Sequence, residues 1–202
     1  SASISRAQLA QISGRASELG VIDSWILGQT YMLELRPDWW MKSEKAYKTC
    51  IARDPGFSMG YSSLSQLYHT HHLACPGVMP DPRTFAESKI LANRAIAMDP
   101  LDSRAHLCRA WSSSLLREFE QAAASFALAR GCNENDPWTQ ISAALGAAFG
   151  GDQSLANKWA ADYLNKGWPT TLPQWGFHAT IRFLDGNDEG CIQAANNAGE
   201  SI

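Results

Sequence analysis

The sequence lacks the features of membrane proteins, nucleic-acid binders and disulfide-stabilised proteins. No apolar stretch approaches the roughly 20 residues that a membrane-spanning helix needs. Only 18% of the 202 residues are charged, the net charge is −3, and no basic tract occurs. We therefore expect no direct contact with nucleic acid and none with a membrane. The five cysteines are odd in number and form no CxxC pair, which indicates reduced thiols and a cytoplasmic protein.

Catalytic motifs are missing as well. The sequence contains no Gly-x-Ser-x-Gly elbow, no phosphate-binding loop and no His-Glu-x-x-His pair, so we expect neither an enzyme nor a cofactor. The one group with metal-ligand residue types is His69, His71, His72 and Cys75, which could hold zinc. No second pair of ligands lies at zinc-motif spacing. We therefore favour a polar helix end, where histidine complements the helix dipole, and expect no metal.

What the sequence does contain is helical periodicity. Alternating Val, Ile and Thr runs are absent, while Ala, Leu, Gln, Glu and Lys fill the periodic segments. Gly20 is expected to end the first helix, and Asp23 and Asp38 to cap the next two. The short connections favour antiparallel helix pairs. The predicted helices span about 6–18, 23–35, 38–53, 58–71, 82–98, 103–116, 118–129, 137–149, 153–164, 173–184 and 188–197.

One pattern occurs twice, 45 residues apart. The segments 47–55 and 92–100 are short apolar-periodic runs that both end in Asp-Pro, and a second helical stretch follows each of them. Proline cannot continue a helix and disfavours helical geometry in the residue before it. Self-similarity at this period marks an array of units that bury their apolar faces against their neighbours. Such arrays typically bind partners.

Small, aromatic and proline residues recur at corresponding places along five segments. With them the chain resembles tetratricopeptide repeat proteins, whose unit is about 34 residues in two antiparallel helices. The resemblance implies an all-α, right-handed solenoid of about five helix pairs over residues 21–202, with residues 1–20 as a lead-in helix. The matching residues are Leu27, Gly28, Tyr31, Tyr47, Cys50 and Pro55; Tyr61, Leu64, Tyr68, Ser88, Ala92, Ala95 and Pro100; Ala105, Ala110, Ala122, Phe126 and Ala129; Ala144, Gly151, Ala156 and Ala160; and Ala179, Gly186 and Ala195.

In this family the first helix of each pair lines a concave inner surface. The resemblance therefore implies that Trp25, Trp111 and Trp138 project into a groove, where tryptophan gives a large contact area at a low entropy cost. Packing in the core is an equal alternative for each of the three. The family's clamp for chaperone tails needs several basic residues, and only Arg104 fits. The residues expected to face the same groove are Gln29, Ser62, Gln66, His69 and Arg104.

These observations favour a module that binds a protein or peptide partner in a tryptophan-lined groove. Insertions near 36–38 and 75–81 resemble the divergent repeats that follow bacterial adenylate or guanylate cyclase domains and winged-helix transcriptional regulators. One alternative is a small-molecule sensor whose ligand sits among the three tryptophans, under the 75–81 loop as a lid. Another is self-assembly into a homodimer through the apolar edge of the last pair. The chain begins with Ser1 rather than methionine, so we expect it to be a piece of a longer protein.

Overall fold

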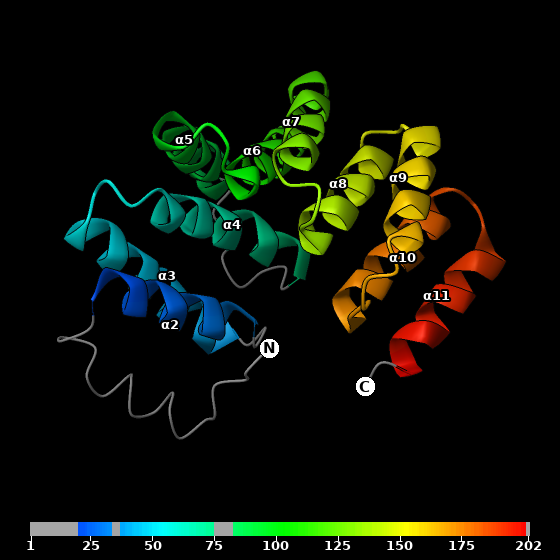
Figure 1. Cartoon of the computed structure of the whole chain (residues 1–202), viewed down its shortest axis with the longest axis horizontal. Coiled ribbons are helices and arrows are strands. Elements are labelled where there is room, and N and C mark those ends of the chain that lie inside the picture. The colour runs from blue at the N-terminus through cyan, green and yellow to red at the C-terminus, as the bar shows by residue number, and fades with distance from the viewer. Residues whose placement is uncertain (1–19, 34–36, 75–82, 201–202) are drawn as a thin grey trace. The chain divides into compact units, whose positions relative to one another are not determined.

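Every element that the computed structural model describes is an α-helix (Figure 1). The described residues are 20–33, 37–74 and 83–200, and no strand occurs in these three ranges. They divide into two compact units, residues 1–100 and 101–202. The predicted lead-in helix over 6–18 lies outside the described residues, as does the 75–81 loop.

The first unit consists of two helix pairs. Helix α2 (Val21–Leu33) packs against α3 (Pro37–Arg53), and α4 (Ser58–Ala74) packs against α5 (Arg83–Met98). Helix α4 also contacts both members of the preceding pair, so the two pairs stack directly. This is the neighbour-on-neighbour packing of a repeat array.

The second unit consists of three helix pairs. They are α6 (Ser103–Leu115) with α7 (Phe119–Cys132), α8 (Pro137–Phe149) with α9 (Gln153–Asn165), and α10 (Leu172–Leu184) with α11 (Asp188–Glu200). The first helices of successive pairs contact one another, α6 with α8 and α8 with α10. The prediction of five consecutive helix pairs is thus confirmed.

The three pairs of the second unit share one turn between their two helices. In each turn an N–H beyond the first helix donates to a carbonyl five residues earlier, as in a Schellman motif. The residue before that N–H has a positive φ: 64° at Arg117, 86° at Gly151 and 72° at Gly186. Glycine suits this conformation and arginine does not. The hydrogen bonds join Glu118 N to Ser113 O (2.8 Å), Asp152 N to Ala147 O (3.0 Å) and Asn187 N to Arg182 O (3.0 Å).

Aspartates begin several helices, although two of the predicted caps are shifted. The side chain of Asp102 accepts the N–H of Ala105 at 3.0 Å and so caps α6. In contrast, Asp23 lies inside the first turn of α2 and accepts the N–H of Gly20 at 3.2 Å. Asp38 likewise follows the first residue of α3. A carboxylate in the first turn can reach back to the preceding N–H, so the sequence alone does not separate this position from a true cap.

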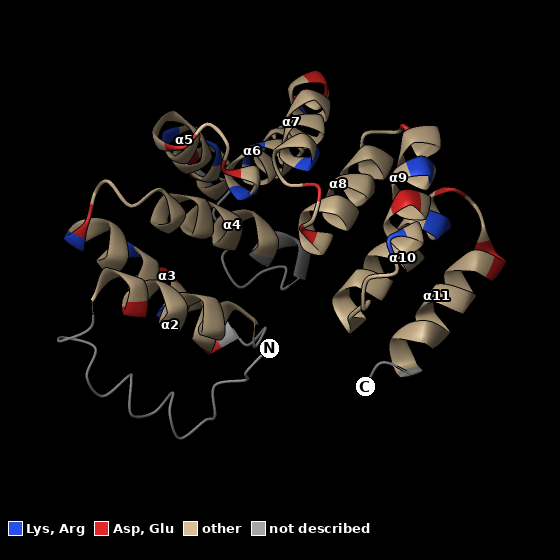
Figure 2. Ribbon diagram, in the orientation of Figure 1, with Lys and Arg blue, Asp and Glu red and all other residues tan. Residues whose placement is uncertain are grey.

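Two glycines let helices approach closely. A β-carbon on Gly28 of α2 would collide with the ring of Tyr47 in α3, and one on Gly146 of α8 would collide with the ring of Phe126 in α7. Gly28 was recognised from the sequence as a repeat residue, whereas the role of Gly146 was not. No helix among the described residues is long and apolar enough to cross a membrane. Figure 2 shows acidic and basic residues interspersed along the helices of each unit.

Candidate partner-binding surface

Trp25 and Gln29 lie one turn apart on α2, and both reach Ser63 on α4. The indole N–H of Trp25 donates to Ser63 Oγ at 2.9 Å, and Gln29 Nε2 donates to the same oxygen at 3.0 Å. Gln29 Nε2 also lies 2.7 Å from the hydroxyl of Tyr47. Ser63 is buried, whereas Trp25 and Gln29 are partly exposed. Two of the residues predicted for the groove therefore lie together, held in fixed orientations by these hydrogen bonds, and their role in partner binding stays a prediction.

The three α4 residues predicted to face the groove are buried. Ser62, Gln66 and His69 are 0%, 8% and 4% exposed, respectively. Ser62 Oγ lies 3.4 Å from the carbonyl of Met59, within its own helix. Gln66 Oε1 is buried and accepts no hydrogen bond from the residues that the structure describes. These side chains do not form an open surface, and their role in partner binding stays a prediction.

Trp111 lies in the core of the second unit. It is 4% exposed, and its indole N–H donates to Ser142 Oγ on α8 at 2.8 Å. Its ring meets Phe126 and Phe149 edge-on, with centroids 5.4 and 5.9 Å away. The packing alternative from the sequence therefore describes the position of Trp111. A contact with a partner through this residue remains a prediction.

Trp138 differs from Trp111 because part of its ring is exposed. It stands in the first turn of α8, where the Asp136 carboxylate accepts its backbone N–H at 3.2 Å. Its ring packs edge-on against Phe177 of α10, with centroids 5.2 Å apart. Arg104, in the first turn of α6, is also partly buried. Trp138 is thus a second tryptophan that is fixed on one side and open on the other.

The metal-ligand group of the sequence cannot be placed as a whole. Cys75 and the side chains of His71 and His72 lie outside the described residues. Within the described part, no three His, Cys, Asp or Glu side chains come together as metal ligands would. Burial, with a smaller contribution from Asp54, raises the pKa of the Cys50 thiol to about 11. Cys50 is therefore a protonated core residue and not a reactive thiolate.

One feature was missed by the sequence analysis. A cavity of about 620 Å³ lies between α7, α8 and α9, and Arg130, Trp159 and Asp162 are among its lining residues. The sequence pattern gave Trp159 no binding role, because Trp159 lies on a second helix and the resemblance places the concave surface on first helices. Charges of opposite sign one turn apart at the ends of α7 and α9 were an available signal. They are Arg130 with Glu134, and Asp162 with Lys166.

Comparisons with known proteins support the fold. No family model and no curated protein sequence matches the chain. Among solved structures it resembles a tetratricopeptide repeat protein from Parabacteroides merdae, with 13% identity and a TM-score of 0.73 over 97% of this chain and 72% of that one. It also resembles a thermophilic TPR protein of Thermus thermophilus (19%, TM-score 0.62, 96% and 90%) and MamA (13%, TM-score 0.52, 81% and 89%). At these identities the likeness shows the fold alone, and that fold is tetratricopeptide-repeat-like.

Proposed function

We propose that the chain is a non-enzymatic interaction module that binds a protein or peptide partner through the exposed parts of its first helices. The observation that carries the proposal is that Trp25 and Trp138 are each anchored on one side and open on the other. Trp25 is held by Ser63, and Trp138 by Phe177. A rigid, half-exposed tryptophan loses little entropy on binding and dominates many interfaces. Gln29 beside Trp25 supplies a polar contact.

The test is an affinity comparison between matched aromatic variants. Partners captured by the intact chain are identified and purified, and their dissociation constants are measured by calorimetry with each variant. We expect Trp25→Ala and Trp138→Ala each to weaken binding by about 2 kcal/mol or more. Phe119→Ala is the control, because Phe119 is 46% exposed but lies on a second helix. Unchanged affinity in both tryptophan variants, or an equal loss in Phe119→Ala, would overturn the proposal.

A substitution of Trp111 tests whether this residue stabilises the core or contacts the partner. Trp111 is 4% exposed and packs among aromatic rings. Trp111→Ala should therefore lower the free energy of unfolding by about 3–5 kcal/mol. Denaturant unfolding of the variant measures this loss. A variant that keeps wild-type stability but loses partner affinity would instead place Trp111 in the interface, as the sequence resemblance implied.

Self-association is a second candidate function, which the last helix pair favours. Phe183 and Ile192 are 65% and 61% exposed, and α11 contacts only α10 among the described helices. Exposed apolar residues of this kind favour pairing, commonly as a two-fold dimer. Sedimentation should show a concentration-dependent dimer that Phe183→Asp weakens. A strict monomer up to about 100 μM would rule out a micromolar dimer.

The context of the module stays a prediction from the sequence. Attachment to a bacterial transcriptional regulator or nucleotide cyclase, a cytoplasmic location, and a small-molecule ligand held by the tryptophans all belong to this category. The full coding sequence tests the first of them directly, because a winged-helix or cyclase domain would be evident in it.

A further inference from the structure

The cavity between α7, α8 and α9 is unrelated to the first-helix residues of the proposed interface. It has a volume of about 620 Å³, within the range of about 300–1,000 Å³ that is typical of ligand sites. Its walls carry Arg130 from α7, Glu134 from the turn that follows, Trp159 and Asp162 from α9, and Lys166 directly after α9. It therefore combines an aromatic wall with two charges of each sign.

Arg130 is a desolvated cation with an unused donor. Its guanidinium lies over the ring of Trp159, 4.4 Å from the centroid, and Nη2 is 3.8 Å from the Asp162 carboxylate. Nη1 is buried and has no hydrogen-bond partner in the described part of the chain. Burial lowers the pKa of Arg130 despite the opposing effect of Asp162 and Glu134. Part of the desolvation cost of binding a carboxylate is thus already present in the folded state, and the ring fixes the guanidinium plane.

The backbone that carries Arg130 is fixed from α8. Gln140 Nε2 donates to the carbonyl of Arg130 at 3.2 Å and to that of Asn133 at 3.0 Å. Gln140 itself is 7% exposed. These two hydrogen bonds connect the end of α7 and the turn that holds Glu134 to the neighbouring helix pair. The charged groups therefore have their positions before any ligand arrives.

The other two charged groups of the cavity form no close ion pair within the described part of the chain. Glu134 makes no hydrogen bond or ion pair with the described residues, and Lys166 makes no ion pair with them. The Lys166 ammonium lies 5.6 Å from the ring centroid of Trp168. The ion pair between Arg130 and Asp162 is long and half-exposed on the carboxylate side, so it contributes little on its own. Cations and anions thus line the same cavity, where Glu134, Asp162 and Lys166 are exposed and Arg130 is mostly buried.

We propose that this cavity binds a small zwitterion, namely a free α-amino acid or a short peptide with both termini free. The ligand carboxylate pairs with Arg130 and Lys166, its ammonium pairs with Glu134 and Asp162, and its apolar part lies against Trp159. An anion alone is opposed by two carboxylates, and a cation alone by Arg130 and Lys166. Only a ligand with both charges satisfies all four groups.

The experiment is calorimetric titration of the whole chain with leucine, phenylalanine, glutamate, lysine and dialanine. We expect at least one of these probes to bind with a dissociation constant between about 1 μM and 1 mM. The N-acetylated and the C-amidated forms of that probe should each bind at least ten times more weakly. Failure of all five probes would overturn the proposal. Equal binding of a blocked form would reduce the site to one for a single charge and would also overturn it.

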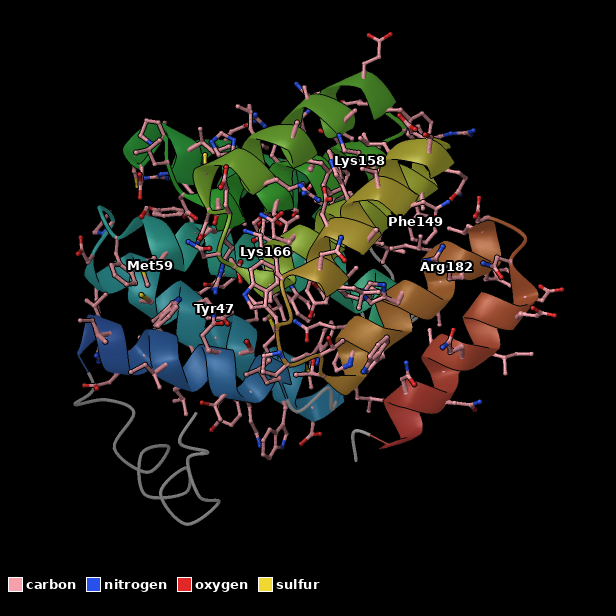
Figure 3. The ribbon with its side chains drawn as sticks, turned by 45° about the vertical axis from the view of Figure 1, so that its right-hand side comes forward. Tyr47, Met59, Phe149, Lys158, Lys166 and Arg182 are labelled. Carbon is pink, nitrogen blue, oxygen red and sulfur yellow. The ribbon has the colours of Figure 1, made fainter. Side chains whose placement is uncertain are left out.

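Three glutamine variants locate the binding. Arg130→Gln and Lys166→Gln should each weaken the best probe at least tenfold, and Lys166 is exposed, so its replacement leaves the fold intact. Lys158→Gln removes the same charge from α9, but Lys158 is not among the residues that line the cavity. Figure 3 labels both lysines and shows them apart along this part of the chain. The affinity of Lys158→Gln should equal that of the wild type. Binding that Lys158→Gln weakens as much as Lys166→Gln, or that Lys166→Gln leaves intact, would contradict the assignment.

Discussion

The pairs α4–α5 and α8–α9 bring two helices together with different chemistry. Small residues lie in both interiors, since only small side chains allow close helix packing. In α4–α5, Ser65 and Ser88 are fully buried and each hydroxyl donates to the other residue's carbonyl, at 2.7 and 2.8 Å. In α8–α9 the small residues of the interior are buried alanines, such as Ala144 and Ala156. One pair therefore joins its helices through hydrogen-bonded serines and the other through alanines, although α8 also buries Gln140 and Ser142.

The two units also differ in how regular their helix lengths and turns are. The helices of the second unit are 13 or 14 residues long, and its three pairs share one turn geometry. In the first unit α3, α4 and α5 are 16 or 17 residues long, and α2 has 13. The comparison teaches that a repeat fold tolerates polar interiors and unequal helices as long as neighbouring pairs still bury each other's faces.

Among the effects that compare the two units, the largest is expected at a buried titratable group of the second unit. His178 is 3% exposed, lies between the rings of Tyr163 and Trp175, and its Nε2 has no hydrogen-bond partner among the described residues. Burial, and then Arg182, lowers the pKa of His178 to about 4, whereas an unfolded imidazole titrates near 6.5. Between these values the unfolded chain binds a proton that the native chain does not. Lowering the pH through this window should therefore cost about 3 kcal/mol of stability.

Urea unfolding at pH 7, 5.5 and 4.5 measures the His178 effect. His178→Phe is the control, because it keeps a ring and removes the proton site. As the pH falls, the wild type should lose free energy of unfolding relative to His178→Phe. Parallel pH profiles would show that the imidazole does not titrate differently on folding.

The next effect compares one close helix approach in each unit. Gly28→Ala forces a methyl group against the Tyr47 ring, and Gly146→Ala forces one against Phe126. Overpacking should cost about 2–3 kcal/mol, of which the higher helix propensity of alanine returns about 1. Gly176→Ala is the matched control, since a β-carbon there meets nothing within 4 Å, and it should gain stability. Thermal melts that place all three variants above the wild type would refute the close approaches.

The serine pair tests the polar interior directly. Ser65→Ala and Ser88→Ala should each cost about 1 kcal/mol, because each removes a buried hydrogen bond. The double variant should cost less than the sum, since the two hydroxyl oxygens also lie 2.9 Å apart and the first substitution already removes this contact. A double-mutant cycle by denaturant unfolding gives the coupling. Strict additivity would mean that the two hydroxyls act independently.

The smallest effect concerns the shared turn. Arg117 has a φ of 64° where Gly151 and Gly186 occupy the same position in the other two pairs. Arg117→Gly should therefore raise stability by about 0.5–1 kcal/mol, and Gly151→Ala should lower it by a similar amount. Differential scanning calorimetry resolves both signs. A loss of stability in Arg117→Gly would show that the arginine side chain contributes more than the strain costs.

The sequence predicted the helices better than it predicted how deeply their side chains are buried. Helix boundaries were close wherever Asp-Pro, Gly-Gly or Asp-Gly follow the last turn, because these residues stop a helix locally. The prediction ended α7 at Ala129, whereas the helix continues to Cys132, because no proline closes that repeat. Ser62 was predicted to face the groove, yet Ser62 and its neighbour Ser63 are both buried.

The site was predicted less well because burial comes from residues far apart in the sequence. Trp25 and Ser63 are 38 positions apart, and no local pattern predicts their hydrogen bond. Trp111 is covered by Phe126 and Phe149, which belong to different helices. The cavity beside Arg130 requires three helices to be in register. Periodicity identifies the face of a helix, but tertiary packing decides how deeply a residue on that face is buried.

The stacking of the second unit also determines the order in which it comes apart. Helix α8 packs against α6, α7, α9 and α10, whereas α11 packs against α10 alone among the described helices. Almost all contacts join elements that are close in sequence, which favours rapid folding. Opening should therefore begin at α11 and progress towards α8, so that amide protons exchange with solvent along a gradient rather than all at once. Within the second unit, α8 should therefore be the last helix whose amide protons exchange.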